Sequence, residues 1–366
     1  MKSFGIAHYV LLGLLAWGLP GVFIGGISAF FISVCIALPL WLFRRFPPSF
    51  AHTRTVGQGG TITVLLLTLM YLLFDMLIGR QKFDSNMFLV VSATANVIDT
   101  ANETVSQGRG PTELLGAMMV VMPFTLIDTA RQTSKTLRAA IWCVSLLYIF
   151  YDTGISRGYL LMAVLSVAIG TATRFRNLIG AGCLALTAFI GASLARGDFD
   201  EVSFSNPLFD GIVWPYINLG LLLQSDCGGA SWIDFIIEFV KKFVPSILIP
   251  KEIFSFNIEM TRCIYPSIIN TVESISIFTW LGEIYYYGPN YLTAIVAGVF
   301  LAVLCRQIDI RLQQMQLPIL RIFAGLMCIV LLRSRVQDVF SFLLFLWIFL
   351  IFYQFISRQK ILKNTE

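Results

Sequence analysis

The chain has 366 residues, of which 57% are hydrophobic and only 13% charged; its formal net charge is +5 and its mean hydropathy is +0.79. Soluble domains carry roughly twice that charged fraction, about 25%. This composition excludes an ordinary soluble globular domain and indicates an integral membrane protein.

Apolar runs of about 15 to 22 residues recur along the whole chain, and runs of this length cross the hydrocarbon core as helices. Lipid satisfies no backbone hydrogen bonds, and the runs are continuous rather than alternating, which excludes a barrel. We therefore predict an all-α polytopic membrane protein with about ten transmembrane helices and one large outer loop. The predicted spans are residues 4–19, 21–43, 61–79, 112–130, 139–153, 158–173, 178–195, 282–304, 318–332 and 337–356.

The same pattern divides the chain into three parts. Residues 1–195 carry the first seven helices, residues 196–281 form the large loop, and residues 282–366 carry the last three helices. Lys and Arg in short loops stay on the cytoplasmic side of the membrane. With the predicted spans, most Lys and Arg residues of the loops fall on the same side as the N-terminus. Both termini are therefore predicted in the cytoplasm and the large loop outside. The cytoplasmic cations are Lys2, Arg44, Arg45, Arg54, Arg131, Lys135, Arg138, Arg174, Arg176, Arg306, Arg311, Arg358, Lys360 and Lys363.

The large loop is too rich in aromatic and aliphatic residues for disorder, and its segment "WIDFIIEFVKKFV" is amphipathic. We expect a partly helical cap on the membrane surface. Cys227 and Cys263 both lie in this loop. They could pair in an oxidising compartment, but the sequence leaves their distance open.

Several Lys and Arg residues fall on the outer side of the membrane, although insertion favours placing these residues in cytoplasmic loops. Arg157 lies in "GISRGYLL" and Arg333 and Arg335 in "LLRSRVQDVF", two connections too short to carry a side chain far from the membrane. Lys251 and Arg262 lie in the large loop. One explanation is snorkelling to lipid phosphate. The other, which the short loops favour, is a binding site for a lipid-linked diphosphate, because guanidinium groups bind phosphate in a bidentate manner.

Residues 271–300, "TVESISIFTWLGEIYYYGPNYLTAIVAGVF", resemble bacterial O-antigen and oligosaccharide repeat-unit polymerases of the Wzy type. Leu281, Gly282, Glu283 and Tyr285 match the family's Leu-Gly-Glu-x-Tyr, whereas "YYGPN" replaces its usual turn. Three further matches follow the family's order: Ser156-Arg157-Gly158; Pro245, Pro250 and Lys251; and either Arg333 or Arg335.

The resemblance implies a GT-C-like glycosyltransferase of the bacterial inner membrane. It would transfer a growing glycan from undecaprenyl pyrophosphate to the nonreducing end of a lipid-linked repeat unit on the periplasmic face. The expected partners are these two lipid-linked oligosaccharides, membrane lipid and a chain-length regulator protein; no nucleic-acid partner is expected.

Charge builds on the leaving phosphate in such a transfer, so hydrogen-bond donors there contribute most. We assign this role to Arg157 and to Arg333 or Arg335, with Lys251, Arg262 and Ser156 as further substrate-binding residues. We expect a metal-independent reaction with no cofactor.

The only histidines, His8 and His52, fall in the first span and in a cytoplasmic loop, so a carboxylate would have to serve as the base. The candidates are Glu259, Glu273, Glu283 and Asp152. Glu283 could instead orient its loop, and Asp152 could be the charge partner of Arg157. Tyr285 belongs to an aromatic run that could stack on sugars or form an interfacial belt.

Three competing functions remain. A related O-antigen ligase would need a histidine in the large loop, which has none. A flippase or transporter of the same lipids would also use a cationic outer cavity, although no related halves are seen in the sequence. A structural subunit of an assembly complex would need no catalytic arginine.

Overall fold

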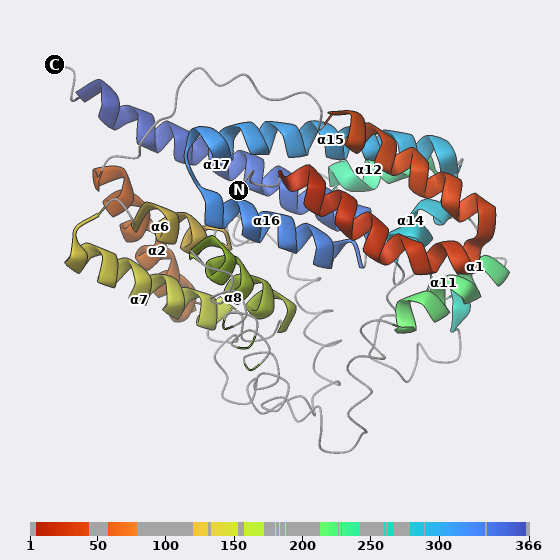
Figure 1. The fold of residues 1–366 in the computed structure, drawn as a ribbon, viewed down its shortest axis with the longest axis horizontal. Coiled ribbons are helices and arrows are strands. Elements are labelled where there is room, and N and C mark those ends of the chain that lie inside the picture. The colour runs from red at the N-terminus through yellow and green to blue at the C-terminus, as the bar shows by residue number, and fades with distance from the viewer. Residues whose placement is uncertain are drawn as a thin grey trace.

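The structure, a computed structural model, describes residues 5–43, 58–78, 120–130, 133–152, 157–171, 213–225, 227, 229–241, 260, 263–265, 279–288, 290–333 and 335–363, with Gly180, Cys183 and Thr187. These residues are almost entirely helical (Figure 1). Among them, three helices are long and apolar enough to cross a membrane: α1 (Ile6–Phe43), α15 (Asn290–Gln314) and α17 (Val336–Lys363). A helical membrane protein is thus supported as a class, whereas the ten spans stay a prediction.

Helix α1 doubles back on itself at Gly26, whose φ of 61° and ψ of −148° are non-helical (Figure 1). Its two limbs are neighbours, since a Cβ placed on Gly18 would lie 3.6 Å from Ser33 Oγ. The predicted break near Pro20 was therefore wrong by several residues. Proline is tolerated within membrane helices, whereas a left-handed backbone needs glycine.

The two limbs of α1 pack against α15 and against α16 (Pro318–Leu331). Gly298 of α15 lets the backbones meet, because a Cβ there would lie 3.1 Å from Ile36 Cα and overlap the Ile36 carbonyl. On the other side, Trp17 Nε1 donates a 2.8 Å hydrogen bond to Ile329 O. These contacts join α1 to the C-terminal helices α15 and α16.

Four further helices lie beside this group: α2 (Gln58–Ile78), α6 (Met122–Ala130), α7 (Lys135–Asp152) and α8 (Arg157–Thr171). Both α6 and α8 contact α16. Phe124 of α6 stacks on Phe323 of α16, with ring centroids 3.8 Å apart. The predicted seventh span, residues 178–195, lies outside the described residues apart from Gly180, Cys183 and Thr187.

The predicted eighth span, residues 282–304, was wrong at its start. A separate short helix, α14 (Trp280–Tyr286), precedes the strand β2 (Tyr287–Gly288), and α15 begins only at Asn290. The sequence does hold a signal for this break, because Gly288-Pro289-Asn290 is a typical turn sequence that the predicted span passed over.

Two carboxylates, the buried Asp128 and the half-buried Asp309, cap helices to which they do not belong. Asp128 of α6 accepts hydrogen bonds from Ile319 N at 2.9 Å and Leu320 N at 3.0 Å, at the start of α16. Asp309 of α15 accepts from Ile6 N at the start of α1 and pairs with Arg321 Nε at 3.0 Å. The free N–H groups of a helix start need such partners where water is absent.

The opposite end of the bundle holds the described parts of residues 196–281. They include α11 (Trp214–Gln224), the strand β1 (Ala230–Ser231) and α12 (Trp232–Lys241). β1 pairs with β2 in parallel, Ala230 opposite Tyr287. Cys227 and Cys263 form a disulfide with Cα atoms 5.9 Å apart, so the pairing that the sequence left open is confirmed.

Candidate functional site

The connection between α16 and α17 carries both candidate arginines. It is short because the chain turns at once: Arg333 N donates to Val330 O at 3.1 Å and Arg335 N to Leu331 O at 3.1 Å. Val336 already begins α17. The half-buried Arg333 and Arg335 are therefore held at the ends of two packed helices, as predicted from the length of the connection.

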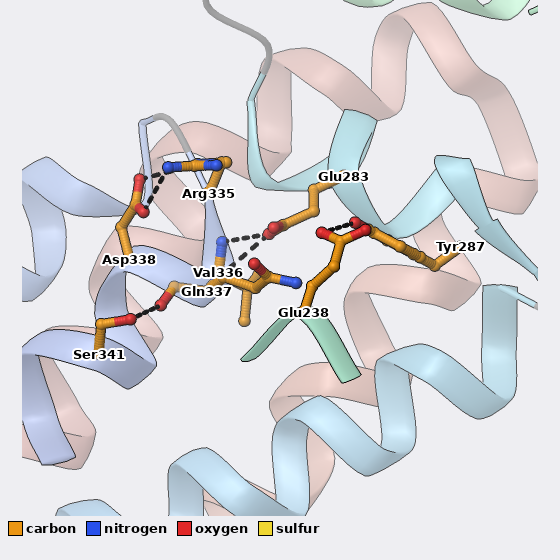
Figure 2. Close-up of polar contacts among 8 residues, drawn as sticks. All are labelled: Glu238, Glu283, Tyr287, Arg335, Val336, Gln337, Asp338 and Ser341. Carbon is orange, nitrogen blue, oxygen red and sulfur yellow. Dashed lines mark hydrogen bonds and ion pairs between the residues drawn. The ribbon is translucent and has the colours of Figure 1, made fainter. Parts of the chain in front are cut away.

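Arg335 forms a bidentate ion pair with Asp338, in the first turn of α17 (Figure 2). Nε donates to Oδ2 at 3.1 Å and Nη2 donates to Oδ1 at 2.8 Å. The two side chains are 19% and 22% exposed, so the pair is sheltered but reachable. Burial alone would lower the pKa of Arg335, but the carboxylates of Asp338 and Glu283 outweigh it and the pKa is raised.

Glu283 of α14 is fully buried and reaches across to the start of α17 (Figure 2). Its Oε2 accepts hydrogen bonds from Val336 N at 2.6 Å and Gln337 N at 3.3 Å. A carboxylate at a helix N-terminus satisfies free N–H groups and the helix dipole. Of the two roles considered for Glu283, these contacts correspond to orienting the loop against its helix.

Two further hydrogen bonds hold α12 against the residues around the α16–α17 connection. Gln337 Nε2 donates to Phe235 O at 3.3 Å. Tyr287 OH donates to Glu238 Oε2 at 2.5 Å (Figure 2). Burial, followed by the nearby Glu238 and Glu283, raises the pKa of Tyr287. The tyrosine therefore stays protonated and acts as a donor.

The backbone of Arg157 begins α8, which packs along α16. Near the end of α8, a Cβ placed on Gly170 would lie 3.4 Å from Ile319 Cα, at the start of α16. The two helices therefore run in opposite directions, and the start of α8 lies toward the end of α16 that leads to Arg333 and Arg335. The Arg157 side chain lies outside the described residues.

Tyr285 lies on α14 but faces the turn of α1. Its hydroxyl would be 3.1 Å from a Cβ placed on Gly25, and burial raises the pKa of the half-buried Tyr285. The role of Tyr285 in substrate binding stays a prediction.

The remaining predicted site residues lie outside the described residues: Ser156, Lys251, Arg262, Glu259 and Glu273, and the side chain of Asp152. Sequence reasoning overlooked Asp338 and Glu238. The signal for Asp338 was available, because an acid three residues after Arg335 on a helix can pair with it. Glu238 had no such signal, since its partner Tyr287 is 49 residues away.

Within the described residues, no group of three or more His, Cys, Asp or Glu side chains is placed to hold a metal ion. No protein-family model, curated protein or solved structure matches the chain. The family resemblance therefore depends on the four short motifs alone.

Proposed function

We propose that the chain is a repeat-unit polymerase of the bacterial inner membrane, a GT-C-like glycosyltransferase that uses undecaprenyl-pyrophosphate-linked glycans. One observation carries this proposal: the start of α8, with Arg157, and the α16–α17 connection, with Arg333 and Arg335, lie toward the same end of the bundle. Guanidinium groups gathered at one membrane surface suit a diphosphate.

The orientation of this end is supported by the disulfide. Cys227 precedes β1, which pairs with β2 directly after α14, so the disulfide belongs to the arginine end of the bundle. Disulfides persist in oxidising compartments. This supports an outer, periplasmic site; the ten spans and the cytoplasmic termini are part of the same proposal.

In the proposed reaction, the nonreducing-end hydroxyl of a lipid-linked repeat unit attacks the anomeric carbon of the growing glycan. The new glycosidic bond forms as the bond to undecaprenyl pyrophosphate breaks, and the electron pair leaves with the diphosphate. Arg157 and Arg333 or Arg335 stabilise that charge. Lys251, Arg262, Ser156 and Tyr285 contact the substrates.

The hydroxyl proton passes to a carboxylate. Because Glu283 accepts two hydrogen bonds from the α17 backbone, we assign it a positioning role in place of the base. Glu259, Glu273 and Asp152 are the candidates for the base.

The test is chain extension by the purified protein with a synthetic lipid-pyrophosphate repeat unit, read as a ladder on a gel with EDTA present. We expect a ladder from the wild type and from Arg306→Ala, a control arginine of α15 outside the proposed site. Arg157→Ala should give none at equal folded yield.

A wild-type ladder that Arg157→Ala leaves unchanged would remove Arg157 from the site. Movement of the lipid across vesicles without any ladder would support a flippase instead. If cells whose protein lacks Arg157, Arg333 and Arg335 still polymerise normally, the protein is a structural subunit.

A further inference from the structure

We infer that Asp338 is a positioning residue that holds one edge of the Arg335 guanidinium and presents the other edge to the diphosphate. The inference extends the proposed function and depends on it. It concerns how Arg335 is aimed, which the sequence motifs do not address.

The geometry follows from the donors of a guanidinium, which has five N–H bonds in one plane. Asp338 takes the side edge, formed by Nε and Nη2, through two hydrogen bonds of 3.1 Å and 2.8 Å. The end edge, formed by Nη1 and the second N–H of Nη2, is a separate fork in the same plane. Among the residues that the structure describes, Nη1 of Arg335 donates no hydrogen bond. Two phosphate oxygens fit this fork.

The carboxylate itself is fixed in place by its helix. Asp338 is the third residue of α17, and the start of α17 is tied to α14 by Glu283 (Figure 2). Gln337, the residue before Asp338, is tied to the α12 backbone by its side-chain amide. Arg335 is therefore aimed by a rigid helix end rather than by its own flexible side chain.

The charges distinguish orientation from attraction. Arg335 and Asp338 together are neutral, so Asp338 weakens the pull of Arg335 on an anion while it restricts the side chain. Removing the Asp338 charge should leave diphosphate binding unchanged or tighter, yet slow the reaction, because catalysis requires the donors to be aimed at the leaving oxygen. A residue that only stabilised the fold would not separate these two quantities.

The experiment compares Asp338→Asn, Asp338→Glu and Ser341→Ala with the wild type. Ser341 lies on the same helix, and its hydroxyl donates only to Gln337 O within its own helix among the described residues, at 2.8 Å. Undecaprenyl diphosphate binding is measured with the full chain in nanodiscs. The kcat and KM of chain extension are measured with the synthetic lipid-pyrophosphate repeat unit.

For Asp338→Asn we expect kcat to fall about tenfold, as expected when a catalytic group is misaligned, while the Kd for undecaprenyl diphosphate stays equal or decreases. Asp338→Glu, which keeps the carboxylate, should recover part of kcat. Ser341→Ala should match the wild type in both quantities.

A wild-type kcat in Asp338→Asn would overturn the inference, and so would an increased kcat, which would make Asp338 a blocking group. Equal losses in kcat and in binding, together with poor folded yield in both Asp338 variants, would show that Asp338 is only a structural residue. That result would overturn the inference as well. Failure of the proposed function is seen separately, because Arg335→Ala and Arg333→Ala would then both bind the diphosphate as the wild type does.

Discussion

Replacing Glu283 by alanine should unfasten α14 from the start of α17. The side chain is fully buried, and its Oε2 accepts hydrogen bonds of 2.6 Å and 3.3 Å from two backbone N–H groups. A hydrogen bond to a charged group contributes about 1.5–3 kcal/mol, and a buried N–H left without a partner costs about 1–3 kcal/mol. The 3.3 Å bond is weak, so we expect Glu283→Ala to lose about 3 kcal/mol of unfolding free energy.

The assay is thermal unfolding of the purified protein in one detergent, followed by intrinsic fluorescence. The loss should lower Tm by roughly 5 °C. Glu283→Gln, whose amide oxygen still accepts, should lose about a third of that. Ser341→Ala is the control. A Tm for Glu283→Ala equal to that of Ser341→Ala would refute the capping role and reopen Glu283 as the base.

Three further predictions concern the fold. In Cys227→Ser the freed and exposed Cys263 should react with a membrane-impermeant maleimide in intact spheroplasts, while the wild type should not; labelling only after permeabilisation would place the disulfide on the wrong side. Gly298→Ala should lower Tm sharply because its Cβ overlaps the Ile36 carbonyl, whereas Gly220→Ala meets only Ile24 Cγ2 at 3.6 Å and should be tolerated; equal Tm values for the two would contradict the close packing of α1 on α15. Asp309→Asn should lose about 3 kcal/mol by leaving the buried Arg321 without its carboxylate, and the Asp309→Asn/Arg321→Gln double variant should lose less than the sum of the single losses; strict additivity would argue against the pair.

The helical class was predictable from the sequence, because a continuous apolar run in lipid can satisfy its backbone hydrogen bonds only as a helix. The changes of direction were not, since hydropathy records burial and not direction. The apolar sequence is continuous through Gly26, where α1 reverses. Between α14 and α15, by contrast, "YYGPN" carries a turn signal that the predicted span passed over. Glycine was the usable signal at the first of these sites, but Pro20 competed with it.

The candidate site was predictable in part of its residues but not in its contacts. Arg335 and Glu283 were both identified from short motifs, yet nothing in the sequence joins Glu283 to the start of α17, 53 residues later. The caps made by Asp128 and Asp309 span 191 and 303 residues. Such contacts depend on which helices pack together, and they become visible only once the bundle is assembled.

The most direct test of the diphosphate site is equilibrium binding of labelled undecaprenyl diphosphate to the full chain in nanodiscs of uncharged lipid. Arg157→Ala should weaken binding at least tenfold, as should Arg335→Ala or Arg333→Ala, because a charge-assisted bidentate contact is removed in each case. Arg306→Ala should bind as the wild type does. Unchanged affinity in all three arginine variants of the outer end would contradict the site.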